Sequence, residues 1–258
     1  RGSSGKRGGR AANGPASRSE PVGGGGREAG GQASQGDSGK SGRASRGDSA
    51  QRTYGGVSAD ERRAQRRAAL LAAALEIIGT QGLAKLTVSG LCAEAGLNER
   101  YYYESFDSRE AVLTALIDAI AEELAIAIVA AVGTAPKDPR ETARAAIAAG
   151  IHVLTDDPRK AKVALVAGMA TPELRTRTTE TVRVFARMVA AEGIDFYGID
   201  DPDSDPAIDF RANYLVGGLV QTLTAWLQGE LSLTRDELIE HTTDVFVLLG
   251  EDLARRLT

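Results

Sequence analysis

From residue 58 to the end of the chain, apolar residues recur three and four positions apart, the spacing of one face of an α-helix. One such series is Leu70, Leu71, Ala74, Leu75 and Ile78. No segment of this region alternates apolar and polar residues between turn signals, as a half-buried strand would. The pattern predicts an all-α fold, and a length of 258 residues is sufficient for a sizeable hydrophobic core.

Several helices are marked at their first residues. Ser58 and Glu61 have the spacing of a capping box, as do Thr234 and Glu237, and Pro158 stands at a first helical position, where its missing N–H costs nothing. Periodicity and these signals together predict about nine helices. Their expected ranges are 58–81, 87–94, 98–104, 108–132, 139–154, 158–169, 172–192, 205–229 and 234–257.

The first part of the chain has a different composition. Residues 1–57 are dominated by Gly, Ser, Ala and Arg, and they contain too few apolar side chains to offset the entropy of ordering. We therefore expect a disordered tail. Residues 1–56 carry ten basic and four acidic side chains, although the whole chain has a net charge of −4. This asymmetry predicts an arm attracted to polyanions, with a solubilising tail as the alternative.

Composition excludes several other classes of protein. The single cysteine, Cys92, forms no intramolecular disulfide and no four-cysteine zinc site. The only histidines are His152 and His241, so neither a metal site nor a cofactor is predicted. The sequence contains no run of 18 apolar residues and no apolar signal-peptide core near its first residues. We expect a soluble cytoplasmic protein without a membrane partner.

Two short predicted helices within residues 86–105 are joined by a tight turn. Thr87 is placed to cap the first helix, and Leu91 belongs to its buried side. Gly96 stands where the chain must reverse through a left-handed conformation, which glycine adopts without a Cβ penalty. Asn98 is a favourable N-cap for the second helix. This arrangement is a helix-turn-helix.

The second of these helices has an unusual composition, with Tyr101, Tyr102 and Tyr103 next to Arg100. Three aromatic hydroxyls are costly to bury together, so some of them are expected to face outward. An exposed surface of tyrosine and arginine suits the DNA major groove, where Arg bonds guanine bidentately. The alternative is that the tyrosines form an internal packing cluster.

Residues 61–121 resemble the DNA-binding domain of the tetracycline-repressor (TetR) family. The resemblance rests on the small residue and glycine of the turn (Ala95-Gly96), on Tyr103 near the end of the second helix, on Phe106 soon after it, and on Arg109 at the start of the next helix. Tyr101 departs from the family, which usually has a small hydroxyl residue there. The resemblance implies double-stranded DNA as a partner.

The resemblance also implies roles for individual residues. Thr87, Tyr103 and Arg109 match phosphate-binding positions, and the residues from Asn98 to Tyr101 occupy the base-facing turn. Tyr102 and Phe106 are expected in the core. The basic cluster at the start of the first helix either contacts the DNA backbone or is a solvated helix face. The predicted DNA-binding residues are Thr87, Asn98, Glu99, Arg100, Tyr101, Tyr103, Arg109, Arg62, Arg63 and Arg66, with Arg67 adjoining them.

Three regions follow from this interpretation. Residues 1–57 are the basic tail, residues 58–121 the DNA-binding domain, and residues 122–258 a domain for effector binding and dimerisation. One short recognition helix makes too few base contacts to be selective, so a twofold dimer on a palindromic operator is expected. The resemblance places its interface on helices 205–229 and 234–257. Gly217-Gly218, inside the first of these, suggests a close approach to a neighbour or a pocket wall.

A small-molecule effector of unknown identity is expected, by resemblance, in a cavity of the second domain. Candidate wall residues are polar or soft side chains on apolar helix faces, although a lone histidine such as His152 on an apolar helix is more often an ordinary core residue than a ligand contact. The candidates are His152, Met169, Phe185, Met188, Tyr214 and Gln221.

The predicted function is a sequence-specific, DNA-binding transcriptional regulator, a homodimeric repressor released from its operator by the effector. An enzyme is not predicted, because residues 110–204 contain no recognisable catalytic constellation. Two alternatives from other classes are a helical protein-binding scaffold and an all-α enzyme that uses the core cavity.

Overall fold

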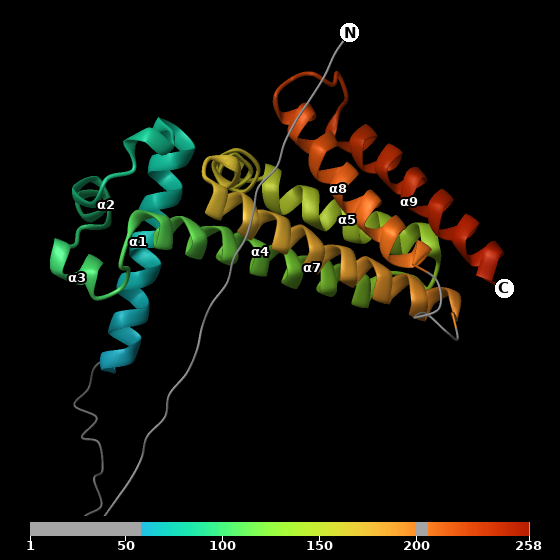
Figure 1. Ribbon diagram of the computed structural model, residues 1–258, viewed down its shortest axis with the longest axis horizontal. Coiled ribbons are helices and arrows are strands. Elements are labelled where there is room, and N and C mark those ends of the chain that lie inside the picture. The colour runs from blue at the N-terminus through green and yellow to red at the C-terminus, as the bar shows by residue number, and fades with distance from the viewer. Residues whose placement is uncertain (1–57, 200–205, 258) are drawn as a thin grey trace, which may run out of the picture. The chain divides into compact units, whose positions relative to one another are not determined.

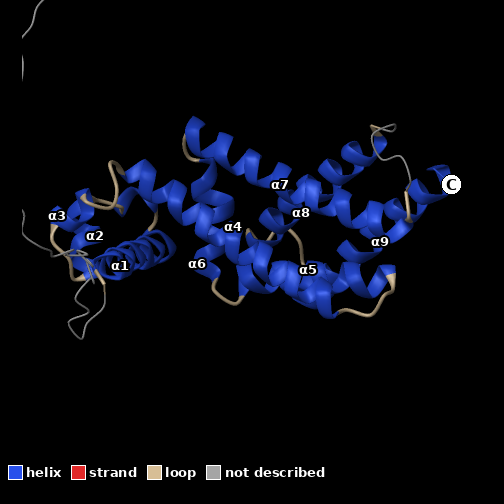
Figure 2. Cartoon of the chain, turned by 90° about the horizontal axis from the view of Figure 1, so that it is seen from below, coloured by secondary structure: helices blue, strands red, loops and turns tan. Residues whose placement is uncertain are grey.

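The computed structural model describes residues 58–199 and 206–257, and among these residues it contains helices and no strand (Figure 1 and Figure 2). The predicted all-α fold is confirmed. The predicted tail, 1–57, lies outside the described residues. The α-helices are α1 (Ala59–Gln81), α2 (Val88–Ala95), α3 (Glu99–Tyr103), α4 (Arg109–Thr134), α5 (Pro139–Thr155), α6 (Pro158–Ala161), α7 (Pro172–Tyr197), α8 (Ala207–Leu227) and α9 (Arg235–Leu257).

The sixth predicted helix, 158–169, is not regular. Only Pro158–Ala161 is α-helical, and the chain continues as a π-helical turn, Lys162–Val166, and a 3₁₀ turn, Ala167–Met169. The tight final turn brings the Gly168 carbonyl to the Thr178 hydroxyl, which donates a hydrogen bond to it at 3.2 Å. A Cβ on Gly168 would lie 2.6 Å from that hydroxyl oxygen, so this packing requires glycine.

The seventh predicted helix, 172–192, is too short. In the structure α7 continues to Tyr197 and ends at Gly198, which adopts a left-handed conformation with φ 62°. Gly193 lies inside the helix instead of ending it. Glycine tolerates a helix interior at a cost of about 1 kcal/mol, so its presence alone does not set a helix end.

Helices α1, α2 and α3 pack around one part of the core. Leu70 of α1, Leu91 of α2 and Tyr102 of α3 are fully buried there, together with Val112 of α4. The expected capping box at the start of α1 is present, because Glu61 N–H donates to the Ser58 hydroxyl at 3.1 Å. Helix α4 extends this core by packing against α5 and α7 along its length.

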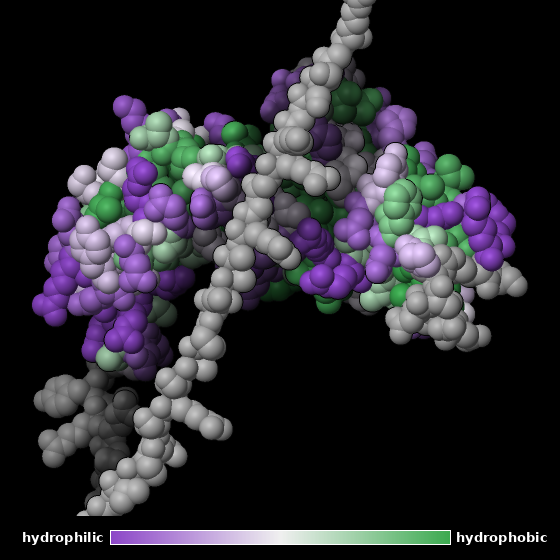
Figure 3. Space-filling model, viewed as in Figure 1, coloured by the Kyte–Doolittle hydropathy of each residue, from purple (hydrophilic) through white to green (hydrophobic). Residues whose placement is uncertain are grey.

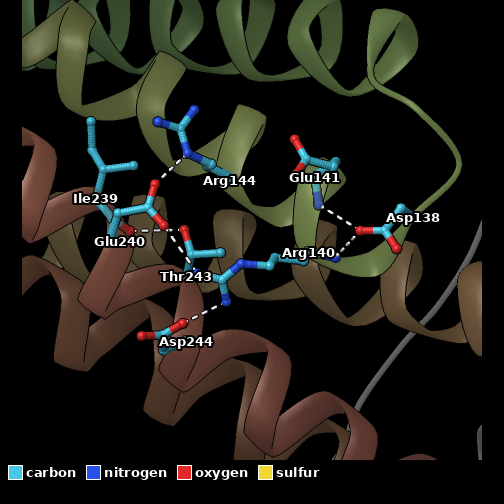
Figure 4. A network of polar contacts seen from close by, with 8 residues as sticks. All are labelled: Asp138, Arg140, Glu141, Arg144, Ile239, Glu240, Thr243 and Asp244. Carbon is cyan, nitrogen blue, oxygen red and sulfur yellow. Dashed lines mark hydrogen bonds and ion pairs between the residues drawn. The ribbon is translucent and has the colours of Figure 1, made fainter.

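Ion pairs join α5 to α9, as Figure 4 shows. Arg140 of α5 bonds Asp244 at 2.5 Å and Glu240 at 3.0 Å, and Arg144 bonds the second oxygen of Glu240. Both guanidinium groups favour the ionised carboxylate and lower the pKa of Glu240, with Arg144 as the main cause. Exposed pairs of this kind contribute little individually, but here they form a network that links the two helices.

The predicted domain boundary at residue 121 falls inside α4, which runs without interruption from Arg109 to Thr134. One helix therefore packs both against α1 and against α5. The division into residues 58–121 and 122–258 remains a prediction.

Candidate nucleic-acid interface and cavity

Helices α2 and α3 have the geometry of a helix-turn-helix. Thr87 caps α2 by accepting a hydrogen bond from Gly90 N–H at 3.0 Å. The helix ends at Gly96, with φ 64°, where any other residue would be strained. Asn98 then caps α3 by accepting from Tyr101 N–H at 3.3 Å. Thr87, Gly96 and Asn98, the positions predicted from the sequence to form the caps and the turn, therefore do so in the structure.

The three tyrosines of α3 have different environments. Tyr102 is completely buried and meets the Phe106 ring at 6.2 Å, which confirms that both belong to the core. Tyr103 is 60% exposed, and its ring stands edge-on to Tyr102. Burial raises the pKa of the Tyr102 phenol, and its hydroxyl has no hydrogen-bond partner. The outward surface of α3 is therefore carried by Tyr103 and by Arg100, whose side chain is 84% exposed.

Tyr101 is half-buried and held by α1. The Arg66 guanidinium lies 4.5 Å from the centre of the Tyr101 ring and 3.9 Å from the Glu104 carboxylate. Arg67, the next residue, stacks 4.3 Å from the Phe106 ring and donates to the Ser105 carbonyl at 3.0 Å. These two arginines therefore pack α1 against α3 and the residues that follow it.

The rest of the basic cluster has a different orientation. Arg62 and Arg63 are exposed near the start of α1, and Arg63 makes a 3.7 Å ion pair with Asp60. Arg109, at the first position of α4, donates from Nη1 to the Leu86 carbonyl at 2.9 Å, and half of its side chain remains exposed. Glu99 is also exposed, in the first turn of α3.

A cavity of about 520 Å³ lies among α4, α5, α7, α8 and α9. Its walls are almost entirely aliphatic and aromatic, and they include Leu124 of α4, Ile147 of α5, Val216 of α8 and Phe246 of α9. Leu165, from the π-helical turn, also contributes to the wall. A space of this size and polarity suits a small apolar molecule.

Two of the six predicted effector residues, Phe185 and Met188 of α7, line this cavity. The other four lie elsewhere. His152 faces Asp156, with Nδ1 3.5 Å from its carboxylate, and Met169 is exposed beside the start of α7. Tyr214 and Gln221 are exposed on α8. Sequence reasoning selects polar and soft side chains on apolar helices, but the rotation of each helix against its neighbours decides which of them face inward.

Sequence reasoning missed most of the cavity wall, including Tyr197 and Arg211. Tyr197, at the end of α7, lies against Gly250 of α9, and Arg211 of α8 also lines the cavity. Burial, followed by the negative charge of Glu251, raises the pKa of the Tyr197 phenol. A usable signal was glycine inside a predicted helix or directly after its predicted end, since several such glycines line the cavity. These glycines are Gly133, Gly150, Gly193 and Gly250.

Comparison with known proteins identifies the helix-turn-helix. Residues 70–116 match the family model of bacterial regulatory proteins, tetR family. The chain is also 31% identical over 152 residues to the HTH-type transcriptional regulator EthR of Mycolicibacterium smegmatis, covering 57% of this chain and 69% of that relative. The chain belongs to the tetR family. It is therefore a DNA-binding transcriptional regulator.

Solved structures share the fold of this chain. The fatty acid degradation regulator FadR of Bacillus halodurans is similar, with a TM-score of 0.59 and 19% identity over 73% of this chain and 96% of that one. FadR of Bacillus subtilis, solved in complex with stearoyl-CoA, has a TM-score of 0.56 and 19% identity over 71% and 97%. None of the described helices of this tetR-family regulator has the length and apolar character needed to cross a membrane.

Proposed function

We propose that this tetR-family regulator is a repressor that binds a palindromic operator as a homodimer and leaves it when an apolar small molecule occupies the cavity. The observation that carries the proposal is the continuity between the cavity wall and α1. Leu165 lines the cavity, and Lys162, three residues earlier in the same π-helical turn, donates from Nζ to the Gly79 carbonyl of α1 at 2.6 Å.

The DNA contacts in this proposal divide by chemistry. Arg100 and Tyr103 project from α3, so they are assigned to base edges and phosphate respectively. Thr87 and Arg109 flank them and are assigned to phosphate, together with Arg62 and Arg63. Asn98 and Glu99 lie at the exposed start of α3, where they face the same groove. Tyr101 and Arg66 are assigned to the DNA surface as one unit, because the Arg66 guanidinium lies over the Tyr101 ring.

An apolar surface on α8 and α9 supports the homodimer. Phe210 and Tyr214 of α8 are 69% and 63% exposed and stack at 6.2 Å, and Leu248 of α9 is 62% exposed. Figure 3 shows apolar side chains at the surface over these helices. A Cβ added to Gly217 or Gly218 would have open space around it, so packing within the described chain does not require glycine there. A second copy approaching closely gives them a role.

The effector is assigned to apolar molecules by the composition of the wall. FadR of Bacillus subtilis, a structural neighbour, was solved with stearoyl-CoA, a ligand with a long aliphatic chain. Occupation of the cavity would displace Leu165 and α4, and with them the contacts of the π-helical turn and α6 on α1. Differential affinity of the effector for the two arrangements is the thermodynamic requirement.

The test is fluorescence anisotropy with labelled DNA from the chain's own promoter region, with and without an apolar probe. The salt dependence of the affinity should be steep, because several phosphate contacts release counterions. Arg100→Ala and Tyr103→Phe should each weaken operator binding, and the probe should weaken it about 5- to 150-fold. Unchanged operator affinity in both variants would show that α3 is not the recognition helix.

A further inference from the structure

We propose that Tyr197 is the specificity-determining residue of the cavity, and that the effector is an uncharged apolar molecule with one hydrogen-bond acceptor, such as a ketone, ester or amide carbonyl. This inference rests on the proposed function of the cavity. It concerns the chemistry of the ligand and the single group that recognises it.

Tyr197 supplies an uncommitted donor in a wall that is mostly apolar. No described residue forms a hydrogen bond with its hydroxyl, whereas the Thr142 hydroxyl of the same wall donates to the Pro136 carbonyl at 3.1 Å. The polar side-chain atoms that are both sealed and unpartnered among the described residues belong to Arg66 and Tyr102. The Tyr197 hydroxyl therefore keeps some exposed surface on a residue that lines the cavity, where the acceptor of a ligand would meet it.

The position of this hydroxyl is set by a glycine. A Cβ on Gly250 would lie 2.9 Å from the Tyr197 hydroxyl oxygen and 3.2 Å from Cε2 of its ring. Only glycine lets the ring lie against α9 at this point. A glycine inside α9 costs about 1 kcal/mol of helix stability. The close contact between Gly250 and the Tyr197 ring explains why a glycine stands there.

The charges at the wall disfavour an anionic ligand. Arg211 is the one cationic side chain among the described residues of the lining, and it is already paired. It donates to Asp252 at 2.6 Å and to the Leu249 carbonyl at 2.5 Å. Hydrogen bonds from Arg211, and then from Arg256, lower the pKa of Asp252, so the pair stays ionised. Glu192, the remaining charged wall residue, would repel a carboxylate.

The phenol itself stays neutral. Burial raises the pKa of Tyr197 above its usual value, so near neutral pH the group keeps its proton. A neutral phenol donates one hydrogen bond to a carbonyl oxygen. The rest of the ligand is held by burial of apolar surface, which gives affinity without direction, so this single donor fixes its orientation.

The experiment compares three soluble probes by calorimetric titration of the full chain: butylbenzene, butyrophenone and 4-phenylbutyrate. Butyrophenone differs from butylbenzene by a carbonyl, and 4-phenylbutyrate carries a charge. Tyr197→Phe should weaken butyrophenone binding about two- to tenfold and leave butylbenzene binding unchanged, as expected for one neutral hydrogen bond. Wild type should bind 4-phenylbutyrate at least about tenfold more weakly than butyrophenone. A tenfold difference in Kd corresponds to about 1.4 kcal/mol of binding free energy.

Two further variants complete the design. Tyr102→Phe removes a tyrosine hydroxyl outside the cavity and should change neither affinity. Gly250→Ala keeps the hydroxyl but displaces the ring, so it should weaken butyrophenone binding selectively. The inference about Tyr197 would be overturned by equal effects of Tyr197→Phe on both neutral probes, or by tighter binding of 4-phenylbutyrate than of butyrophenone to wild type. Neither result would contradict the proposal that the effector is largely apolar. Failure of wild type to bind either neutral probe would overturn the proposed effector class as well.

Discussion

At the scale of single residues, the recognition helix depends on side chains that face opposite ways. Tyr102 and Tyr103 are neighbours, yet one is completely buried and the other 60% exposed. On α1, Arg66 and Arg67 turn toward the rings of Tyr101 and Phe106, and so cover them. A cation over an aromatic face contributes about 0.5–1 kcal/mol at an exposed site. These contacts orient α3 from the protein side.

The hydroxyl of Tyr102 is buried and has no hydrogen-bond partner among the described residues. An unsatisfied buried polar group costs about 1–3 kcal/mol, so Tyr102→Phe should raise the free energy of unfolding by about 1 kcal/mol. Urea denaturation followed by circular dichroism measures this change. Tyr103→Phe is the control, because its exposed hydroxyl should leave stability within about 0.5 kcal/mol. A loss of stability in Tyr102→Phe would mean that the hydroxyl does have a partner.

Arg66 and Arg63 should differ in the way they affect DNA binding. Arg63 is exposed and is proposed to contact phosphate, so Arg63→Ala should reduce the salt slope of the DNA affinity by about one. Arg66 packs on Tyr101, so Arg66→Ala should weaken binding without a change in slope. Anisotropy titrations at several salt concentrations separate the two, and the reverse pattern would place Arg66 on the DNA backbone.

At the scale of helices, α1 connects two sites. The first half of α1 contacts α3 through Arg66. The second half contacts α6, because Arg159 of α6 donates a hydrogen bond to Glu76 at 2.5 Å, and the same guanidinium donates to Asp157 at 2.8 Å. The stem of Arg159 crosses α1 at Gly79, where an added Cβ would lie 2.4 Å from Cγ of Arg159. Close packing of this kind would transmit a displacement of α6 to α1 in the proposed release mechanism, since packed helices do not deform continuously.

Glu76→Gln should therefore weaken the coupling between the cavity and DNA. The substitution removes the charged bond between α6 and α1 but none of the predicted DNA contacts. We expect DNA affinity without ligand to change less than about twofold, and the factor by which an apolar probe weakens DNA binding to fall about two- to tenfold. Glu180→Gln is the matched control, because Glu180 pairs with Arg177 within α7. An unchanged factor would exclude this route.

At the scale of the whole molecule, one copy of the chain leaves an apolar surface of α8 and α9 exposed among the described residues. Phe210, Tyr214 and Leu248 are each more than 60% exposed, although exposed apolar side chains usually occur singly. A dimer would bury them and set the distance between two recognition helices at about one DNA turn. Its stability would then control DNA affinity.

Leu248→Glu should convert the dimer to a monomer at micromolar concentration, because it places a charge at the centre of the apolar contact. Size-exclusion chromatography with light scattering reports the mass, and operator affinity should fall with it. Ile126→Glu, at an equally exposed apolar position on α4, should leave the mass of a dimer. A dimer in the Leu248 variant would place the interface elsewhere.

The local features of this protein follow from its sequence. Caps at Ser58, Thr87 and Asn98 and the left-handed Gly96 all depend on residues within about one helical turn, where backbone and hydrogen-bond geometry leave few choices. For the same reason most of the predicted helix ranges are close to those found.

Tertiary structure decided the rest. The cavity is built by five α-helices and the π-helical turn, whose relative rotations depend on long-range packing. Periodicity identifies an apolar face but not the element that packs against it. Tyr197 therefore lies on Gly250, 53 positions away, and Arg66 on Tyr101, while Tyr214 and Gln221 face outward. The sequence determined which helices form and where they begin, and packing determined which of their side chains share a site.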